Sequence, residues 1–294
     1  MPQLGRLLTA MVTPFDAELN VDYDRAAELA ARLLREGSEG LVVAGTTGES
    51  PTLTDEEKLA LFRVVKEAAG EAPVVAGTGS NDHAHTVHLT RAAQEVGVDA
   101  VMLVGPYYNK PSQEGYFRHF SLAAGATDLP VIIYNIPGRT GSNITADTLL
   151  RLAGEVPNLV GVKEASGDLD QVTRLCAGTP EDFRVWSGDD GMTLPVMAVG
   201  GAGVISVVAH VAGAQMAQMI AAFVAGEVEL SATLHQTLQP LVRAAFLPSG
   251  NPACIKRALQ ICGFDCGGLR LPLVEASAAD TQQITQACEK LGLA

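Results

Sequence analysis

The sequence predicts an α/β protein, a (β/α)8 TIM barrel followed by a C-terminal helical extension. Short apolar runs alternate with amphipathic helical segments, roughly eight such units fill residues 6 to 225, and the pattern of strands stops after about residue 226. The chain of 294 residues has an ordinary length for one barrel of this kind. We therefore expect a barrel over residues 1–225 and a helical region over residues 226–294.

The predicted strands are mostly unbroken apolar runs rather than alternating ones. This pattern is typical of parallel strands that are covered on both faces. The runs lie at 6–12, 40–45, 73–79, 99–104, 130–135, 159–163, 183–188 and 202–207. An open doubly wound sheet is the alternative, but no GxGxxG motif follows the first run.

The helical segments between these runs begin at recognisable caps. The segment 53–70 has Thr54 as its N-cap, Glu57 three residues later as a capping box, and Gly70 as its stop. Ser112 and Thr145 are expected to cap the segments 112–126 and 145–156 in the same way. Three more helical runs, at 230–246, 251–263 and 278–292, form the predicted extension.

Composition excludes several classes of function. A formal charge of −13 argues against nucleic acid as a partner, because binding phosphates needs a basic surface. No run approaches the ~20 apolar residues of a membrane span, and the start "MPQLGRLLTAMVTPF" has no export signal. We expect a cytoplasmic protein that contacts neither nucleic acid nor membrane.

Metal binding is also not expected. The five cysteines form no CxxC motif, and no further ligands are spaced near Cys262 and Cys266. The "HAH" at 83–85 falls at the start of a helix, where alternate residues point apart. His85 and His88 share a face there but lack acidic partners, so we interpret them as structural or solvated.

Hydroxyl groups, small residues and one lysine gather at the predicted strand ends. In a parallel barrel these ends form the active site. They carry Thr13, Thr46, Thr47, Gly79, Tyr107, Tyr108, Tyr134, Lys163, Gly188, Asp190 and Ser206. No cluster of carboxylates with histidine appears among them, which disfavours metal-assisted hydrolysis.

Lys163 ends the apolar run "LVGVK". A lysine at a strand end commonly extends to solvent. Apolar surroundings would instead desolvate the amine and lower its pKa by roughly 2–3 units from about 10.4. A partly neutral lysine with Tyr134 and Tyr108 nearby suits Schiff-base chemistry on a carbonyl substrate.

Two further stretches could bind carboxylates. The turn "AGTTGESPTLT" at 44–54 combines glycines with the hydroxyls of Thr46 and Thr47 and could form a backbone nest. Arg139 in "YNIPGRTG" could grip a second carboxylate with its guanidinium. Taken alone, an ordinary polar turn and a solvated arginine explain these residues equally well.

The chain resembles a known family through motifs that occur in order along nearly its whole length. They are "TAMVTPF", "GTTGES", "GTGSN", "PYYNKPSQEG", "YNIPGRTG", "GVKEASGD", "SGDD" and "GAGVISV". With these motifs the chain is similar to the dihydrodipicolinate synthase family, in the pyruvate-dependent class I aldolase superfamily that also holds N-acetylneuraminate lyase. The resemblance implies a Schiff-base-forming lyase that condenses pyruvate with L-aspartate 4-semialdehyde in lysine and diaminopimelate biosynthesis.

The resemblance also implies a catalytic set. Lys163 would form the Schiff base with pyruvate, and Tyr134 would relay protons. Thr46 would complete a triad with Tyr134 and with Tyr108 from a neighbouring subunit. A borrowed tyrosine requires at least a dimer, and the family implies a homotetramer built as a dimer of dimers.

The substrate-binding residues follow from the same resemblance. Thr47 would bind the pyruvate carboxylate, Ile205 would line the pocket near Lys163, and Arg139 would hold the carboxylate of aspartate semialdehyde. The covalent imine would take the place of any cofactor or metal. Arg139 favours the synthases over the nearest alternative, an aldolase acting on N-acetylneuraminate or a 2-keto-3-deoxy acid. A barrel that binds a keto acid without turnover is a further alternative, which the intact catalytic set disfavours.

Two departures from the family pattern stand out. His210 in "SVVAH" occupies a place where asparagine is expected. Asp55, Lys58 and His85 occupy the places that bind the effector in lysine-inhibited members. Because Lys58 puts a cation where lysine must be accommodated, we expect weak or absent inhibition by lysine.

Overall fold

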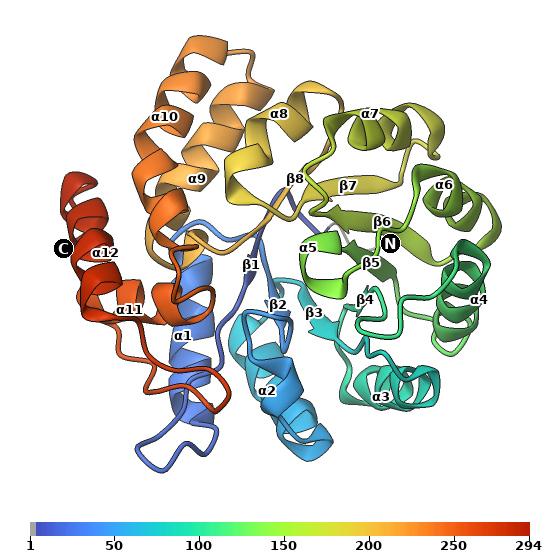
Figure 1. The fold of residues 1–294 in the computed structure, drawn as a ribbon, viewed down its shortest axis with the longest axis horizontal. Helices are drawn as coiled ribbons and strands as arrows, with labels where there is room; N and C mark the ends of the chain where they lie inside the picture. Colours follow the sequence, from blue (N-terminus) through green and yellow to red (C-terminus); the bar gives the residue numbers. More distant parts are fainter. Residues whose placement is uncertain (1–3) are drawn as a thin grey trace.

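The computed structural model describes residues 4–294 and shows a closed barrel of eight parallel strands (Figure 1). Consecutive strands pair along the chain, and β8 closes the ring by pairing with β1. The strands are β1 (Leu7–Ala10), β2 (Gly40–Val43), β3 (Val74–Gly77), β4 (Ala100–Val104), β5 (Val131–Asn135), β6 (Leu159–Glu164), β7 (Arg184–Ser187) and β8 (Gly203–Ser206). The closed ring confirms the predicted barrel over the open doubly wound sheet.

Helices surround the barrel on its outside (Figure 1). They are α1 (Tyr23–Arg35), α2 (Asp55–Ala69), α3 (His83–Val96), α4 (Gln113–Ala124), α5 (Pro137–Thr140), α6 (Ala146–Glu155), α7 (Leu169–Gly178), α8 (Thr193–Ala198) and α9 (Ala209–Val224). The short α5 differs from the others because it lies over the mouth of the barrel in this view.

The unbroken apolar strands reflect two separate layers of packing. One set of strand residues packs inside the barrel, where Leu8, Val42, Ile132 and Ile205 form a cluster with Trp186. The alternate residues pack outward against the helices in a larger cluster. Because both faces are buried, the runs are almost entirely apolar, and the buried Thr9 of β1 is hydrogen-bonded to the Ser38 hydroxyl at 2.6 Å. The same alternation fixes which strand-end residues face the barrel axis.

The predicted helix starts are confirmed at two of three caps. Thr54 and Glu57 form the reciprocal capping box, and the Ser112 hydroxyl accepts a hydrogen bond from the Gly115 amide at 3.2 Å. Thr145 does occupy the N-cap position of α6, but its hydroxyl forms no cap. It donates instead to Oε1 of Gln113 at 3.1 Å, because α4 brings that amide close.

The extension consists of α10 (Val228–Ala244), α11 (Ala253–Ile261) and α12 (Ala278–Lys290), which lie at one side of the barrel, with α10 and α11 packed against α9 (Figure 1). These helices confirm the predicted C-terminal helical region. The division into domains 1–225 and 226–294 stays a prediction, and its first three residues lie outside the described part.

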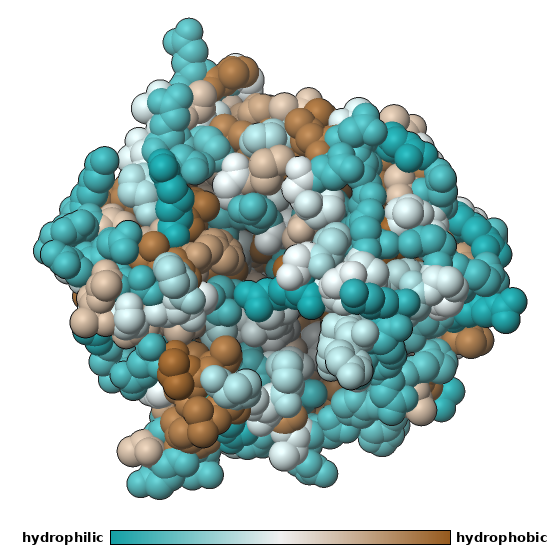
Figure 2. Space-filling model, in the orientation of Figure 1, coloured by the Kyte–Doolittle hydropathy of each residue, from teal (hydrophilic) through white to brown (hydrophobic). Residues whose placement is uncertain are grey.

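The surface is mainly hydrophilic on the face that Figure 2 shows, as the net charge of −13 leads one to expect. An apolar patch lies over the loop between α11 and α12, where Leu271 and Val274 are exposed. Within residues 4–294, no helix combines the length and apolar character needed to cross a membrane.

Candidate active site

Lys163 lies on β6 directly beside Tyr134 of β5, its partner in the strand register. The residue is only 4% exposed, and its Nζ lies 4.4 Å from the centroid of the Tyr134 ring. Burial lowers the pKa of Lys163 to about 8, while the Asp190 carboxylate raises it and the Arg139 guanidinium lowers it further. About one amine in ten is then neutral at pH 7, against fewer than about one in a thousand for an ordinary lysine.

The absence of a side chain at Gly188 leaves room for Lys163, and a buried hydrogen-bond network fixes the strand that carries it. A Cβ atom at Gly188 would lie 2.6 Å from the Ala165 Cβ and 3.3 Å from the Lys163 Cε, so glycine leaves the room that the lysine occupies. The next residue, Glu164, accepts hydrogen bonds from the side-chain amides of Asn135 and Gln171, each at 2.9 Å. These bonds fix the end of β6 and therefore the direction of the amine.

Tyr134 is buried beside the amine and hydrogen-bonded to Thr46. Burial raises the pKa of its phenol well above the usual range, and Arg139 and the hydrogen bond with Thr46 oppose that change. The phenol therefore keeps its proton at neutral pH.

A cavity of about 450 Å³ opens next to this pair. Thr46, Tyr107, Tyr134 and Arg139 line it. Arg139 reaches the cavity from α5, and its Nη2 donates to the main-chain oxygen of Asn251 at 3.3 Å. The structure thus brings together Lys163, Tyr134, Thr46 and Arg139, four of the residues that the sequence indicated.

Thr47 and Ile205 are buried, and like Lys163 they are not among the residues that line the cavity. Thr47 is 3% exposed, and its hydroxyl oxygen accepts a hydrogen bond from Nδ2 of Asn251 at 2.8 Å. Ile205 is fully buried in the same interior cluster as Tyr134.

Tyr108 does not join these residues within the single chain. Its side chain is 90% exposed, and its φ of 73° places it in the left-handed region that few non-glycine residues adopt. The preceding residue, Tyr107, lines the cavity in its place.

The histidines behave differently from the sequence-based interpretation in one respect. His85 does have an acidic partner, because its Nε2 lies 2.9 Å from both carboxylate oxygens of Asp55. The start of α3 comes close to the start of α2, which sequence spacing could not show. Among residues 4–294, no group of three or more histidine, cysteine or acidic residues is arranged for a metal ion.

His210 lies between the ends of β1 and β8. Its Nε2 accepts from the Val12 amide at 3.0 Å, and its Nδ1 donates to the Val207 oxygen at 2.7 Å. Burial lowers its pKa to about 4, so the ring is neutral at pH 7. The histidine therefore cross-links two strand ends, and it is not among the residues that line the cavity.

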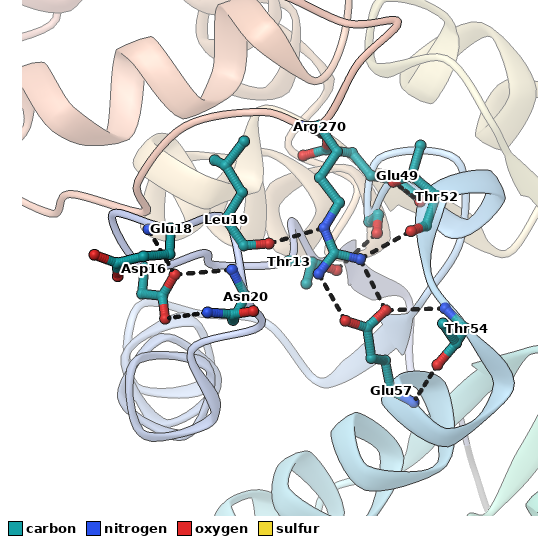
Figure 3. A network of polar contacts seen from close by, with 11 residues as sticks. Thr13, Asp16, Glu18, Leu19, Asn20, Glu49, Thr52, Thr54, Glu57 and Arg270 are labelled. Atoms are coloured by element: carbon teal, nitrogen blue, oxygen red, sulfur yellow. Dashed lines mark hydrogen bonds and ion pairs between the residues drawn. The ribbon is translucent and has the colours of Figure 1, made fainter.

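The extension reaches the loop after β2 through a buried ionic network (Figure 3). Glu49 has a left-handed φ of 56° and is 1% exposed. Its carboxylate lies 2.7 Å from Nζ of Lys256 and accepts from the Arg270 amide at 3.1 Å. Arg270 also pairs with Glu57 of α2 at 2.6 Å. Sequence reasoning missed Lys256, Arg270 and Asn251, because no motif or periodicity marks residues that meet the barrel from so far along the chain.

Comparisons with known proteins identify the family. The model of the dihydrodipicolinate synthetase family matches residues 3–291. The 4-hydroxy-tetrahydrodipicolinate synthase of Moorella thermoacetica is 58% identical over 292 residues, which cover 99% of each chain. The crystal structure of a dihydrodipicolinate synthase from Bacillus anthracis has a TM-score of 0.96 at 48% identity and covers 98% of this chain and 99% of that one. The synthase of Cyanidioschyzon merolae, solved with lysine bound, has a TM-score of 0.97 at 45% identity and covers 99% of both chains. The chain therefore belongs to the dihydrodipicolinate synthetase family.

Proposed function

We propose that this chain catalyses 4-hydroxy-tetrahydrodipicolinate synthesis, the condensation of pyruvate with L-aspartate 4-semialdehyde. The observation that carries the proposal is a buried lysine whose pKa is lowered to about 8 and whose Nζ contacts the ring of a buried tyrosine. The full-length relatives that carry the synthase name support this function over that of a sugar-acid aldolase.

The first half of the reaction joins pyruvate to the enzyme. The neutral Nζ of Lys163 attacks the keto carbon of pyruvate, and the carbinolamine loses water to give an imine. Tyr134 supplies the proton that leaves with this water and recovers a proton through Thr46. Thr47 holds the pyruvate carboxylate, and Ile205 covers the methyl side of the pocket.

The second half forms the carbon–carbon bond. Loss of a methyl proton converts the imine to an enamine, whose carbon attacks the aldehyde carbon of the semialdehyde. Arg139 at the cavity mouth binds the carboxylate of this second substrate with its guanidinium. Attack of the substrate amine on the imine carbon closes the ring and releases Lys163. The scheme places the reaction in lysine and diaminopimelate biosynthesis and needs no cofactor beyond the covalent imine.

The assembly follows from Tyr108. Because its ring is exposed and absent from the cavity of its own chain, we propose that it completes the triad in a second copy, within a cytoplasmic homotetramer built as a dimer of dimers. Mixing inactive Tyr108→Phe and Lys163→Ala protomers tests this. Activity returns if Tyr108 crosses the interface, because one mixed site then contains both native residues. No recovery in mixed dimers would contradict the shared triad.

Reductive trapping tests the central step. Borohydride in the presence of pyruvate is expected to fix a three-carbon adduct that peptide mapping assigns to Lys163. Lys66→Ala is the matched control, since Lys66 pairs with Asp99 at the partly exposed edge of the barrel and its loss leaves the adduct intact. An adduct on another lysine, or turnover by Lys163→Gln, would refute the proposal. Turnover with sugar acids but not with aspartate semialdehyde would favour the aldolase alternative.

A further inference from the structure

Asn251 contacts two substrate-binding residues at once, although it belongs to the extension. It lies just before α11, and its side-chain Nδ2 donates to the Thr47 hydroxyl oxygen at 2.8 Å. Its main-chain oxygen accepts from Arg139 at 3.3 Å. The residue is 8% exposed, and its contact with Thr47 is buried, whereas its contact with Arg139 is only partly buried.

The direction of the first hydrogen bond determines what Thr47 can offer a ligand. A hydroxyl group has one proton to donate and two lone pairs that accept. An amide NH2 can only donate, so Thr47 accepts from Asn251 and keeps its own proton for another acceptor. Within residues 4–294, that proton has no protein acceptor, which leaves it free for a carboxylate.

This arrangement leaves one buried polar atom without a hydrogen bond. The other side-chain atom of Asn251, its Oδ1, is buried without a hydrogen-bond partner. Buried polar atoms are nearly always paired, so an exception calls for an explanation. Presenting the NH2 group to Thr47 explains it, because the opposite orientation of the amide would make Thr47 donate its proton to Asn251.

We propose that Asn251 is a positioning residue that directs the Thr47 proton toward the keto-acid carboxylate, while its main chain separately fixes Arg139 for the second substrate. The inference rests on the proposed function, because it assumes that Thr47 binds the pyruvate carboxylate. It assigns to the extension a direct part in substrate selection.

A double-mutant cycle tests the proposal. Asn251→Ala is expected to raise KM for pyruvate about 10-fold, the usual loss for one hydrogen bond to a charged group. KM for aspartate semialdehyde should change less than about twofold, because the main-chain contact with Arg139 is kept. In a Thr47→Val background the same substitution should have no further effect on KM for pyruvate. An equal effect in both backgrounds would show that Asn251 acts only on the fold and would overturn the inference.

A second variant keeps the test decisive if Asn251→Ala does not fold. Asn251→Asp has the same shape but presents only acceptors at pH 7, so Thr47 must turn its proton toward residue 251. KM for pyruvate should rise at least 10-fold, and an unchanged value would show that the amide already accepted from Thr47. Ser249→Ala is the matched control, since Ser249 holds the same turn through Asp280 without touching Thr47. Trapping of pyruvate on the native enzyme is measured first, because its failure would refute the proposed function itself rather than the role of Asn251.

Discussion

Replacing Lys163 with methionine should make the protein more stable at neutral pH while abolishing turnover. The ammonium form of Lys163 is disfavoured in the folded protein, where burial lowers its pKa from 10.5 to about 8. A separation of about 2.5 pKa units corresponds to about 3 kcal/mol of unfolding free energy. Methionine has a similar length and no charge, so it removes this cost without leaving a large cavity.

The sign of the pH dependence follows from the two pKa values. Below pH 8 the lysine is mostly protonated in both states, and the full cost of burying the charge is present. As the pH rises from 8 toward 10.5, the folded protein holds a neutral amine, and the advantage of methionine disappears. Other groups that titrate in this range are shared by both proteins and cancel in the difference.

Urea unfolding of both proteins at equal protomer concentration, at pH 7 and at intervals up to pH 10.5, measures this difference. Equal concentration matters because association adds to the apparent stability. We expect Lys163→Met to be more stable by about 3 kcal/mol at pH 7 and by less than about 1 kcal/mol at the alkaline end. Equal stability at pH 7, or a difference that does not change with pH, would show that burial does not lower the pKa of Lys163 in the folded protein.

Three further outcomes are expected. Tyr134→Phe should lower kcat by about 100-fold or more, the usual effect of losing a proton relay, with KM for pyruvate little changed in steady-state assays; nearly normal turnover would exclude the relay. Free lysine should inhibit weakly or not at all, because the Lys58 side chain lines the cavity and its ammonium would repel that of the effector. The Lys58 ammonium lies 3.9 Å from the Asp55 carboxylate. Submillimolar inhibition of the purified enzyme would contradict this prediction. The unfolding free energy of the native protein should fall by about 3 kcal/mol relative to that of His210→Asn as the pH falls from 6.5 to 4. The reason is that burial lowers the pKa of His210 to about 4, so the folded protein resists a protonation that the unfolded chain accepts. Parallel curves of unfolding free energy against pH, from chemical denaturation, would refute this.

The barrel was predictable because its strands bury both faces. Unbroken runs such as "GLVV" in β2 and "VIIYN" in β5 carry a signal that depends only on local sequence. The Thr145 cap shows where local signals fail. A threonine in the right position lost its capping role because Gln113, from another helix, offered a competing partner. Caps are decided by tertiary contacts as well as by sequence.

The residues of the candidate site also differ in whether the sequence alone could predict them. Lys163 and Tyr134 were predictable, since strand ends in a parallel barrel converge on one rim. The pairing of His85 with Asp55 was not, because it depends on how α2 and α3 approach each other. Asn251 gave no signal at all, since it meets Thr47 across 204 positions of sequence. Residues at strand ends could be predicted because the barrel brings those ends to one rim, whereas contacts between helices and loops could not.

The extension is physically a part of the site rather than an addition to it. The loop that carries Thr46 and Thr47 is bounded by Ala44 and Glu49, both held at positive φ, at 51° and 56°. Such backbone persists only where surrounding contacts over-determine it. Here those contacts come from the extension, because Lys256 neutralises the buried Glu49 carboxylate. Without the Lys256 ammonium the loop would keep a buried, unpaired charge next to strained backbone, a state that costs several kcal/mol. The barrel therefore supplies the proposed nucleophile on a strand, while the loop proposed to bind the substrate carboxylate is held by residues of the extension.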